Sequence, residues 1–492
     1  MSIVRASGMP AFFALLATTV SACGGSSTPH PSPPPPPPLS RQVTISSVVN
    51  QLAEDGSTTT DVPAPPSSIS VVLDDGTTIA AAAGLPGKWT AQVPAGPWWA
   101  VLGDTRYRVT GDALDLGYLT AARPSLVVPT VATGATLTLS GLQPWIVGND
   151  TLQLFSWSGQ SWDVFDPKFS AAASNGAAFE DWNAPTYGNG ALMLLTPADR
   201  LYAIQYRKSH DTQNGIDYQH AVAFTSASGL SMTNGQPFST TLPAMTAPAQ
   251  AGTVSADWRT TQFEAAAQPF DYRWPHQMSV FAEAMQAGGE VPYAVSPNLL
   301  DFSPSNAPSG ATPDVKLSSL SYGRPMPPQY RDILYVGWVG AVSRTAAGSP
   351  ANAVAYAYVV RRDAIEAVPS PLVPLISVVR AVQIAGRDAG VVQSLVGLTP
   401  TVSWTPPATG TPNRYIVKLY TVPPGGGAWT LVTSLNLPGS TTSVQVPPGL
   451  QQSGRSYYLS ISAQAGAGSD VAPLRWHLPN GVAAYATQVY TP

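Results

Sequence analysis

Prolines and turn-forming dipeptides constrain this chain more than any other feature of its sequence. Fifty prolines are spread over 492 residues, and a proline inside a helix removes a hydrogen bond and clashes with the preceding turn. Asn-Gly occurs at 175–176, 189–190, 214–215, 234–235 and 480–481, and Asp-Gly at 55–56 and 75–76. Both dipeptides tolerate positive φ and suit tight hairpins. The sequence therefore predicts a mainly β, antiparallel protein with few helices.

Composition limits the kinds of partner. Hydrophobic residues make up 44% of the chain, enough for real cores, whereas charged residues make up 11%, less than half of the usual share of about 25%. The net charge is −4 and no basic block occurs, since Arg361 and Arg362 form an isolated pair. Nucleic acid is therefore not an expected partner.

The N-terminus has the pattern of an export signal. Arg5 precedes an apolar stretch from Ala11 to Val20, which is too short to cross a hydrocarbon core of about 30 Å as a helix. The stretch ends in Val20-Ser21-Ala22-Cys23, and Cys23 is the only cysteine. This segment resembles the lipobox of bacterial lipoproteins. The alternative is an ordinary signal peptide in which the cysteine occurs by chance.

The lipobox resemblance implies that residues 1–22 are a signal peptide and that Cys23 is lipidated at its thiol and acylated at its new amino group. Two or three acyl chains hold a protein durably at a membrane, whereas one holds it weakly. Gly24 after the cysteine resembles the pattern for sorting to the outer membrane. The expected location is the outer membrane or cell surface, with the lipid as the membrane contact. A lone cysteine also excludes an internal disulfide.

Residues 23–40 predict a stiff spacer. Residues 28–38 read TPHPSPPPPPP, and such a run favours extended polyproline II, which rises about 3.1 Å per residue. The spacer would lift the folded part away from the lipid. The alternative, a ligand for an SH3-type domain, does not suit an exported bacterial protein.

Residues 41–130 predict a first β-sandwich. Residues 87–101 read GKWTAQVPAGPWWAV and resemble the hairpin that closes the sheet in carboxypeptidase-regulatory-like domains. That resemblance implies a spacer or packing module without catalytic residues. The adjacent Trp98 and Trp99 could bind sugar, although one of two neighbouring strand aromatics usually faces the core.

Residues 397–492 resemble a fibronectin type III domain. Apolar residues alternate around Trp404, along Tyr415 to Leu419 and along Tyr457 to Ala463. The resemblance implies a sandwich in which Trp404 is the tryptophan of the second strand and Tyr457 the tyrosine of the corner motif. Residues 464–482 depart from the family pattern and predict an enlarged loop before the last strand.

Residues 131–396 predict a large, irregular β-rich domain of unknown type. Expected strands lie at Ala135–Leu139, Thr151–Trp157, Ala191–Leu195, Leu201–Tyr206, Val222–Ser226, Tyr335–Val342 and Ala353–Arg361, and a helix is expected at Ala256–Ala267 with Ser255 as its N-cap. The segments 142–154 and 257–259 resemble uncharacterised lipoproteins of Gram-negative bacteria. That resemblance implies no activity.

Residue sets that could carry chemistry are few. The sequence contains no Gly-x-Ser-x-Gly, His-Glu-x-x-His, P-loop or Gly-x-Gly-x-x-Gly motif, so no catalytic residue, metal site or cofactor is predicted. The nearest approach to a metal set is His210, Asp211, Asp217 and His220. These residues flank Asn214-Gly215, however, and are better interpreted as polar groups near the tip of an exposed hairpin.

The segment 155–187 is the candidate ligand-binding stretch because tryptophans and carboxylates gather there. Exposed rings beside acids are typical of sugar-binding faces, and a glycosidase needs two carboxylates at a fixed separation. Core packing with solvated acids is the simpler alternative. The candidate ligand-binding residues are Trp157, Trp162, Trp182, Asp163 and Asp166.

Three functions remain open on the sequence. The favoured one is a non-catalytic, envelope-anchored lipoprotein that acts in surface adhesion, as a scaffold or as an interaction module, with an envelope protein, surface protein or glycan as partner. The alternatives are a carbohydrate-binding accessory protein and an anchored hydrolase with its site in residues 131–396. Fold resemblance supports the first, but fold alone does not determine function.

Overall fold

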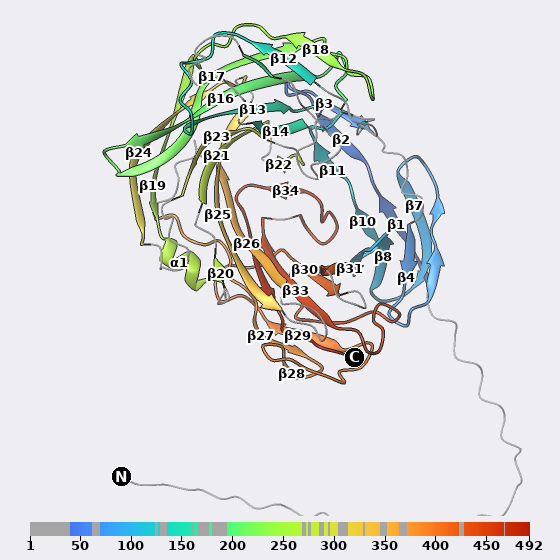
Figure 1. Cartoon of the computed structure of the whole chain (residues 1–492). Coiled ribbons are helices and arrows are strands. Elements are labelled where there is room, and N and C mark those ends of the chain that lie inside the picture. Colours follow the sequence, from blue (N-terminus) through green and yellow to red (C-terminus); the bar gives the residue numbers. More distant parts are fainter. Residues whose placement is uncertain are drawn as a thin grey trace, which may run out of the picture. The chain divides into compact units, whose positions relative to one another are not determined.

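The computed structural model describes residues 40–492 except 62–68, 124–125, 128–134, 160, 166–176, 180–193, 268–271, 274–276, 285–289, 294–295, 304–312, 328–329, 345–351, 364–370, 423–427 and 467. The expected signal peptide, Cys23 and the expected spacer up to residue 39 thus lie outside the described residues, whereas Ser40 begins the first strand. Strands dominate residues 40–492, and the prediction of a mainly β, largely antiparallel protein is confirmed (Figure 1).

The first sandwich packs two sheets around a common core. One sheet contains β10 (Ala113–Asp115), β1 (Ser40–Ser46), β7 (Lys88–Pro94) and β6 (Ala82–Ala83) in that order. Strands of the other are β4 (Ser70–Val72), β5 (Thr78–Ala80), β8 (Trp98–Leu102) and β9 (Thr105–Val109). Alternation places Trp89, Trp98 and Tyr107 in the shared core. A small sheet of β11 (Tyr118–Thr120), β2 (Val49–Leu52) and β3 (Thr58–Asp61) follows.

Strands β7 and β8 differ from the hairpin expected at residues 87–101. β7 pairs with β1 and β6, whereas β8 pairs with β4 and β9. The connection therefore passes from one sheet of the sandwich to the other. Both tryptophans of β8 are buried on opposite faces, Trp98 in the core of the sandwich and Trp99 in the main core of the chain. Burial of Trp99 requires a second layer of protein, which the local sequence does not reveal.

The middle region contains the longest strands. Their bounds are β12 (Ala135–Leu139), β13 (Asp150–Ser156), β14 (Ser161–Phe165), β15 (Ala177–Phe179), β16 (Arg200–Asp211), β17 (Ile216–Ser228), β18 (Phe238–Thr241), β19 (Gln250–Trp258), β20 (Tyr272–Arg273), β21 (Gln277–Ala284), β22 (Glu290–Val291), β23 (Asn298–Phe302), β24 (Val315–Arg324), β25 (Tyr330–Arg344) and β26 (Asn352–Asp363). β12 has the predicted bounds, and five further expected strands are found with shifted or extended ends. At 191–195, by contrast, Leu194 and Leu195 are not in a strand and the rest lies outside the described residues.

The hairpin of β16 and β17 turns at the expected Asn214-Gly215. Gly215 adopts a φ of +66°, a conformation that glycine reaches without strain. Its N–H donates to the carbonyl oxygen of Asp211. Asn480-Gly481, in contrast, begins the strand β35, because both residues pair with β26 and Gly481 also pairs with β33.

The helix expected at Ala256–Ala267 is mostly wrong. β19 continues to Trp258 because Ala256, Asp257 and Trp258 pair with residues of β24, and α1 spans only Thr260–Ala265. The helix begins late and without the expected serine cap. The carboxylate of Asp314 instead accepts a hydrogen bond from the N–H of Thr261 at 3.1 Å. Pairing with a distant strand thus overrides the local helix signal.

The C-terminal region forms two facing sheets. The first has the order β28 (Arg387–Asp388), β27 (Arg380–Ile384), β29 (Thr401–Thr405) and β32 (Ser443–Gln445). In the second, β31 (Thr430–Pro438), β30 (Arg414–Thr421), β33 (Tyr457–Ala465) and β35 (Asn480–Ala486) lie side by side. Trp404 packs edge-on against Tyr415 between them, with ring centroids 5.2 Å apart.

Backbone pairings link the three sequence regions. β31 pairs in parallel with β9, and β35 pairs with β26. The segment between β33 and β35 carries β34 (Trp476–His477), which pairs with β22. Arg475 of that segment forms ion pairs with Asp115 and Glu290. In the described part of the chain, no helix has the length and apolar character needed to cross a membrane.

Candidate functional site

The residues predicted for ligand binding are only partly described. Cys23, Asp166 and Trp182 lie outside the described residues, and for Trp162 and Asp163 only the backbone, in β14, is described. Trp157 is fully buried. Its ring packs edge-on against Phe155 and Tyr330, with centroids 6.3 and 5.1 Å away. Trp157 thus lies in the core, and the ligand-binding role predicted for the other four residues stays a prediction.

The predicted polar set on the β16–β17 hairpin separates into pairs. Nδ1 of His210 lies 2.7 Å from Oδ1 of Asp217, and both side chains are exposed. Asp211 accepts hydrogen bonds from the N–H groups of Gln213 and Asn214 and so orders the hairpin loop. Nε2 of His220 lies 3.0 Å from Oγ of Ser209. Within the described ranges, no three His, Cys, Asp or Glu side chains are placed to hold a metal ion.

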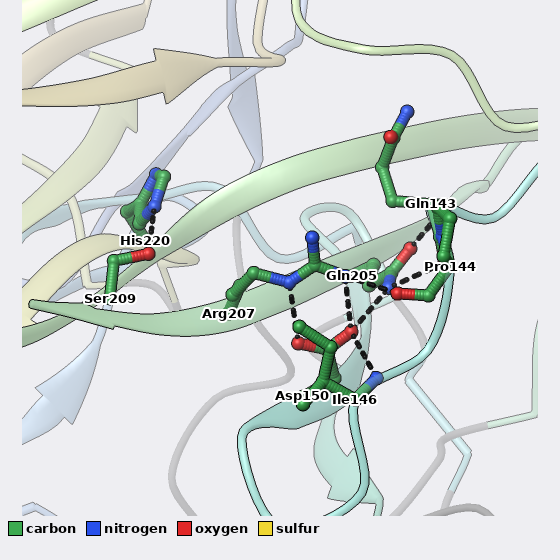
Figure 2. A network of polar contacts seen from close by, with 8 residues as sticks. All are labelled: Gln143, Pro144, Ile146, Asp150, Gln205, Arg207, Ser209 and His220. Carbon is green, nitrogen blue, oxygen red and sulfur yellow. Dashed lines mark hydrogen bonds and ion pairs between the residues drawn. The ribbon is translucent and has the colours of Figure 1, made fainter.

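A buried polar network lies beside His220 and centres on Asp150 (Figure 2). The side chain of Asp150 has no exposed surface and accepts from Nε and Nη2 of Arg207 at 2.8 and 2.7 Å. The N–H of Ile146 and Nε2 of Gln205 donate to the same carboxylate at 3.1 and 2.8 Å. The network fastens the segment 143–146 to β16, and its charged groups satisfy one another.

His220 is affected by this network. Burial and, secondarily, the positive charge of Arg207 hold the pKa of His220 below its ordinary value. Its ring stacks on Tyr218, with centroids 5.0 Å apart. These contacts favour the neutral imidazole in the folded chain.

A second polar site is a cleft of about 960 Å³ between the first sandwich and the C-terminal strands. It is lined by the β4–β5 turn, by Trp99, Arg106 and Arg108 of β8 and β9, and by the segment 437–449, which includes β32. We call it the Arg106 cleft. At Gly76, which has a φ of +87°, an added Cβ would lie 3.3 Å from Cγ of Pro448. The β4–β5 turn and the segment 437–449 therefore approach one another closely at this point.

Strand alternation places the arginines in the cleft. Trp98, Tyr107 and Val109 face the core of the first sandwich, so Arg106 and Arg108 project from the opposite face of β9. Trp99 lies on that same face, directly across from Arg108 in the strand register. The pattern RYRV at 106–109 carries this signal in the sequence, because its alternation places both arginines on one face of the strand.

Arg108 is fully engaged within the protein. Its Nη2 donates to Oδ2 of Asp74 at 2.6 Å, and its guanidinium lies 4.9 Å from the ring centroid of Trp99. Nε1 of Trp99 donates to the same carboxylate at 3.1 Å. The hydrogen bond from Arg108 is the main cause that lowers the pKa of Asp74. Trp99, Asp74 and Arg108 therefore form a satisfied structural group.

Arg106 differs from Arg108. It is half-buried, and no other described residue forms a hydrogen bond or an ion pair with its side chain. Desolvation by burial lowers the pKa of Arg106, and no carboxylate of the described residues opposes that effect. An arginine stays protonated at neutral pH even so. The cleft therefore presents a positive charge that the fold does not neutralise, which suits an anionic group.

No protein-family model matches the chain, and no curated protein is significantly similar to it.

Proposed function

We propose that this chain is a lipid-anchored envelope protein that binds an anionic ligand in the Arg106 cleft without chemically converting it. The observation that carries the proposal is the half-buried, uncompensated guanidinium of Arg106 in a cleft of about 960 Å³. Taking a charge out of water is unfavourable unless a partner compensates it. A bound carboxylate or phosphate would supply that compensation and would gain a charge-assisted hydrogen bond.

The charged residues around the cleft support binding rather than turnover. They are Asp74, Asp75, Arg106 and Arg108. Asp74 is held by Arg108, and hydrogen bonds from Thr77 lower the pKa of the exposed Asp75. General acid–base catalysis favours a group whose pKa lies near the working pH. Neither aspartate has the raised pKa that a general acid at neutral pH would need.

The C-terminal strand order supports a fibronectin type III-like module as part of this proposal. β27, β29 and β32 face a sheet of β31, β30, β33 and β35. The hydroxyl of Tyr457 accepts a hydrogen bond from the N–H of Gln452 at 2.8 Å, as expected of a tyrosine corner. Such modules present surfaces, which agrees with an adhesion or interaction role.

Anchoring is tested by cell fractionation. Cys23→Ala removes the only thiol that could carry a lipid, so the variant should be soluble or uncleaved, whereas wild type should fractionate with membranes. Cys23→Ser is the matched control and should behave like Cys23→Ala, since a hydroxyl does not replace the thiol nucleophile. A mature-length Cys23→Ala chain that still fractionates with membranes would refute the lipid anchor.

Ligand binding is tested with the purified full-length chain in detergent. Labelled hexaglutamate and labelled polygalacturonate oligomers are titrated separately and their masses are measured after incubation. At least one probe should bind saturably, weaken with added salt, lose binding in Arg106→Gln and be recovered unchanged. Lys88→Gln on β7, which pairs within the opposite sheet of the first sandwich, is a charge-matched control and should bind normally. Failure of both probes, or cleavage of either, would overturn the proposal.

A further inference from the structure

The wall of the Arg106 cleft is the last strand of a sheet. β32 pairs with β29 on one side, and the order β28-β27-β29-β32 ends at β32. All three residues of β32, Ser443, Val444 and Gln445, line the cleft. Consecutive strand residues point to opposite faces, so the cleft borders the edge of β32 rather than one face.

The register of β29 and β32 identifies the backbone groups at that edge. The backbone N–H of Trp404 donates to the carbonyl oxygen of Thr442, and the backbone N–H of Val446 donates to the carbonyl oxygen of Pro400. Hydrogen-bonded pairs alternate with non-bonded pairs in an antiparallel ladder, so Val444 bonds to Val402 between them. Ser443 and Gln445 then direct their N–H and C=O groups away from β29. No backbone bond from these groups to another described residue is present.

The opposite sheet continues beyond this edge. β31, which faces the sheet of β29 and β32, is followed by β9, β8 and β4 through backbone pairing. Trp99 of β8 belongs to the same buried cluster as Leu437 and Val444. One sheet therefore stops at β32 while the other extends under the cleft. The missing neighbour of β32 would lie above β9, where Arg106 projects.

We propose that the Arg106 cleft accepts an extended peptide segment, which pairs with the free edge of β32 and places an acidic side chain on Arg106. This inference rests on the proposed function and names its ligand class. Strand addition to an exposed edge is a common mode of peptide recognition, in which backbone bonds give affinity and side-chain contacts give specificity. An acidic glycan would satisfy Arg106 but could not continue the ladder of alternating N–H and C=O groups.

The test uses the acetylated, amidated peptide Thr-Val-Thr-Glu-Thr-Val-Thr with a fluorescent label, titrated into the full-length chain in detergent. Three analogues accompany it: one with Gln for Glu, one with Lys for Glu, and one with N-methyl groups on alternate backbone amides. The Glu peptide should bind at least about tenfold more tightly than each analogue, because a charge-assisted or backbone hydrogen bond is worth about that factor. In Arg106→Gln, the Glu and Gln peptides should bind equally.

A matched pair of variants isolates the strand edge. Ser443→Pro removes an outward N–H that the fold does not use, whereas Ser443→Ala removes the hydroxyl and keeps the N–H. Binding of the Glu peptide should fall about tenfold in the first and stay within about twofold in the second. Melting temperatures of both variants are compared first. If Ser443→Pro is unfolded, the affinities of the N-methylated and unmodified peptides for the wild-type chain test the backbone pairing instead.

The outcomes separate this inference from the proposed function. Binding of polygalacturonate that depends on Arg106, without binding of the Glu peptide, would overturn strand addition and leave an anion-binding cleft. Equal binding of the N-methylated and unmodified peptides would also overturn it. If no anionic probe binds, both proposals fall.

Discussion

Arg207 and Arg106 both lie on strands and are both partly buried, but their surroundings differ in charge. Arg207 on β16 makes a two-pronged ion pair with the fully buried Asp150 (Figure 2). Arg106 on β9 is also removed from water in part, yet no described residue neutralises it. The first arginine fastens a loop to a sheet and is closed to other partners. The second leaves its charge available, and this difference is why the cleft and not the Asp150 network is the proposed binding site.

The largest expected effect is on stability at the paired site. Asp150→Ala would remove the carboxylate that accepts from Arg207, Gln205 and the N–H of Ile146, although Arg207 and Gln205 would each keep a backbone carbonyl as acceptor. Breaking a buried ion pair costs about 3–5 kcal/mol, and the loss should approach the lower value because Arg207 can turn partly to water. Urea denaturation measures the change in the free energy of unfolding. Asp217→Asn, at the exposed pair with His210, is the control and should leave the denaturation midpoint unchanged. Equal effects of the two substitutions would contradict the structural role of Asp150.

A smaller effect is expected from His220, which should make the free energy of unfolding depend on pH. Burial, with a contribution from Arg207, lowers the pKa of His220, so below its ordinary value of about 6.5 the unfolded chain binds a proton that the folded chain does not. Stability should therefore decrease as the pH falls from about 7 through 6.5, until the folded-state pKa is passed. His220→Gln should remove this part of the decline, while His210→Gln, which retains His220, should keep it. Identical profiles for wild type and His220→Gln would contradict a lowered pKa of His220 in the folded chain.

The smallest effect on stability is expected at Arg106. Arg106→Gln removes a charge without breaking an intramolecular contact of the described residues, so the free energy of unfolding should change by less than about 0.5 kcal/mol. Urea denaturation of Arg106→Gln beside Arg207→Gln checks the comparison directly. A loss at Arg106 as large as that at Arg207 would mean that Arg106 is a structural cation, and the binding proposal would lose its main support.

The alternation of apolar and polar residues predicted most of the expected strands of the middle region, but it did not predict which strands pair with one another. The bounds of β12 and the hairpin turn at Gly215 follow from alternation and from an Asn-Gly pair. The helix expected at Ala256–Ala267 was shortened because three of its residues pair with β24. In the same way, residues 87–101 read as a hairpin although their two strands belong to different sheets. Pairing over long sequence separations depends on the whole fold, which a local window does not contain.

The candidate site likewise depends on contacts between segments that are distant in the sequence. The sequence offered tryptophans and carboxylates of the segment 155–187 as a candidate ligand-binding set, with core packing as the simpler alternative, and Trp157 of that set lies in the core. The Arg106 cleft was not predicted because its parts come from β4–β5, β8–β9 and β32, more than 300 residues apart at the extremes. The only local indication of the cleft was a pair of arginines at alternating positions of a strand whose other face is apolar.

The sequence by itself determined the mainly β architecture, because scattered prolines and turn dipeptides oppose long helices and alternation specifies which side of each strand is buried. Only the tertiary structure decided which polar groups would be satisfied. Asp150 meets Arg207 through the pairing of β13 with β16. Arg106 and the edge of β32 meet no partner among the described residues, because one sheet ends where the facing sheet continues. Hydrogen bonds and ion pairs act over a few ångströms, so their formation depends on distances that chain order does not fix.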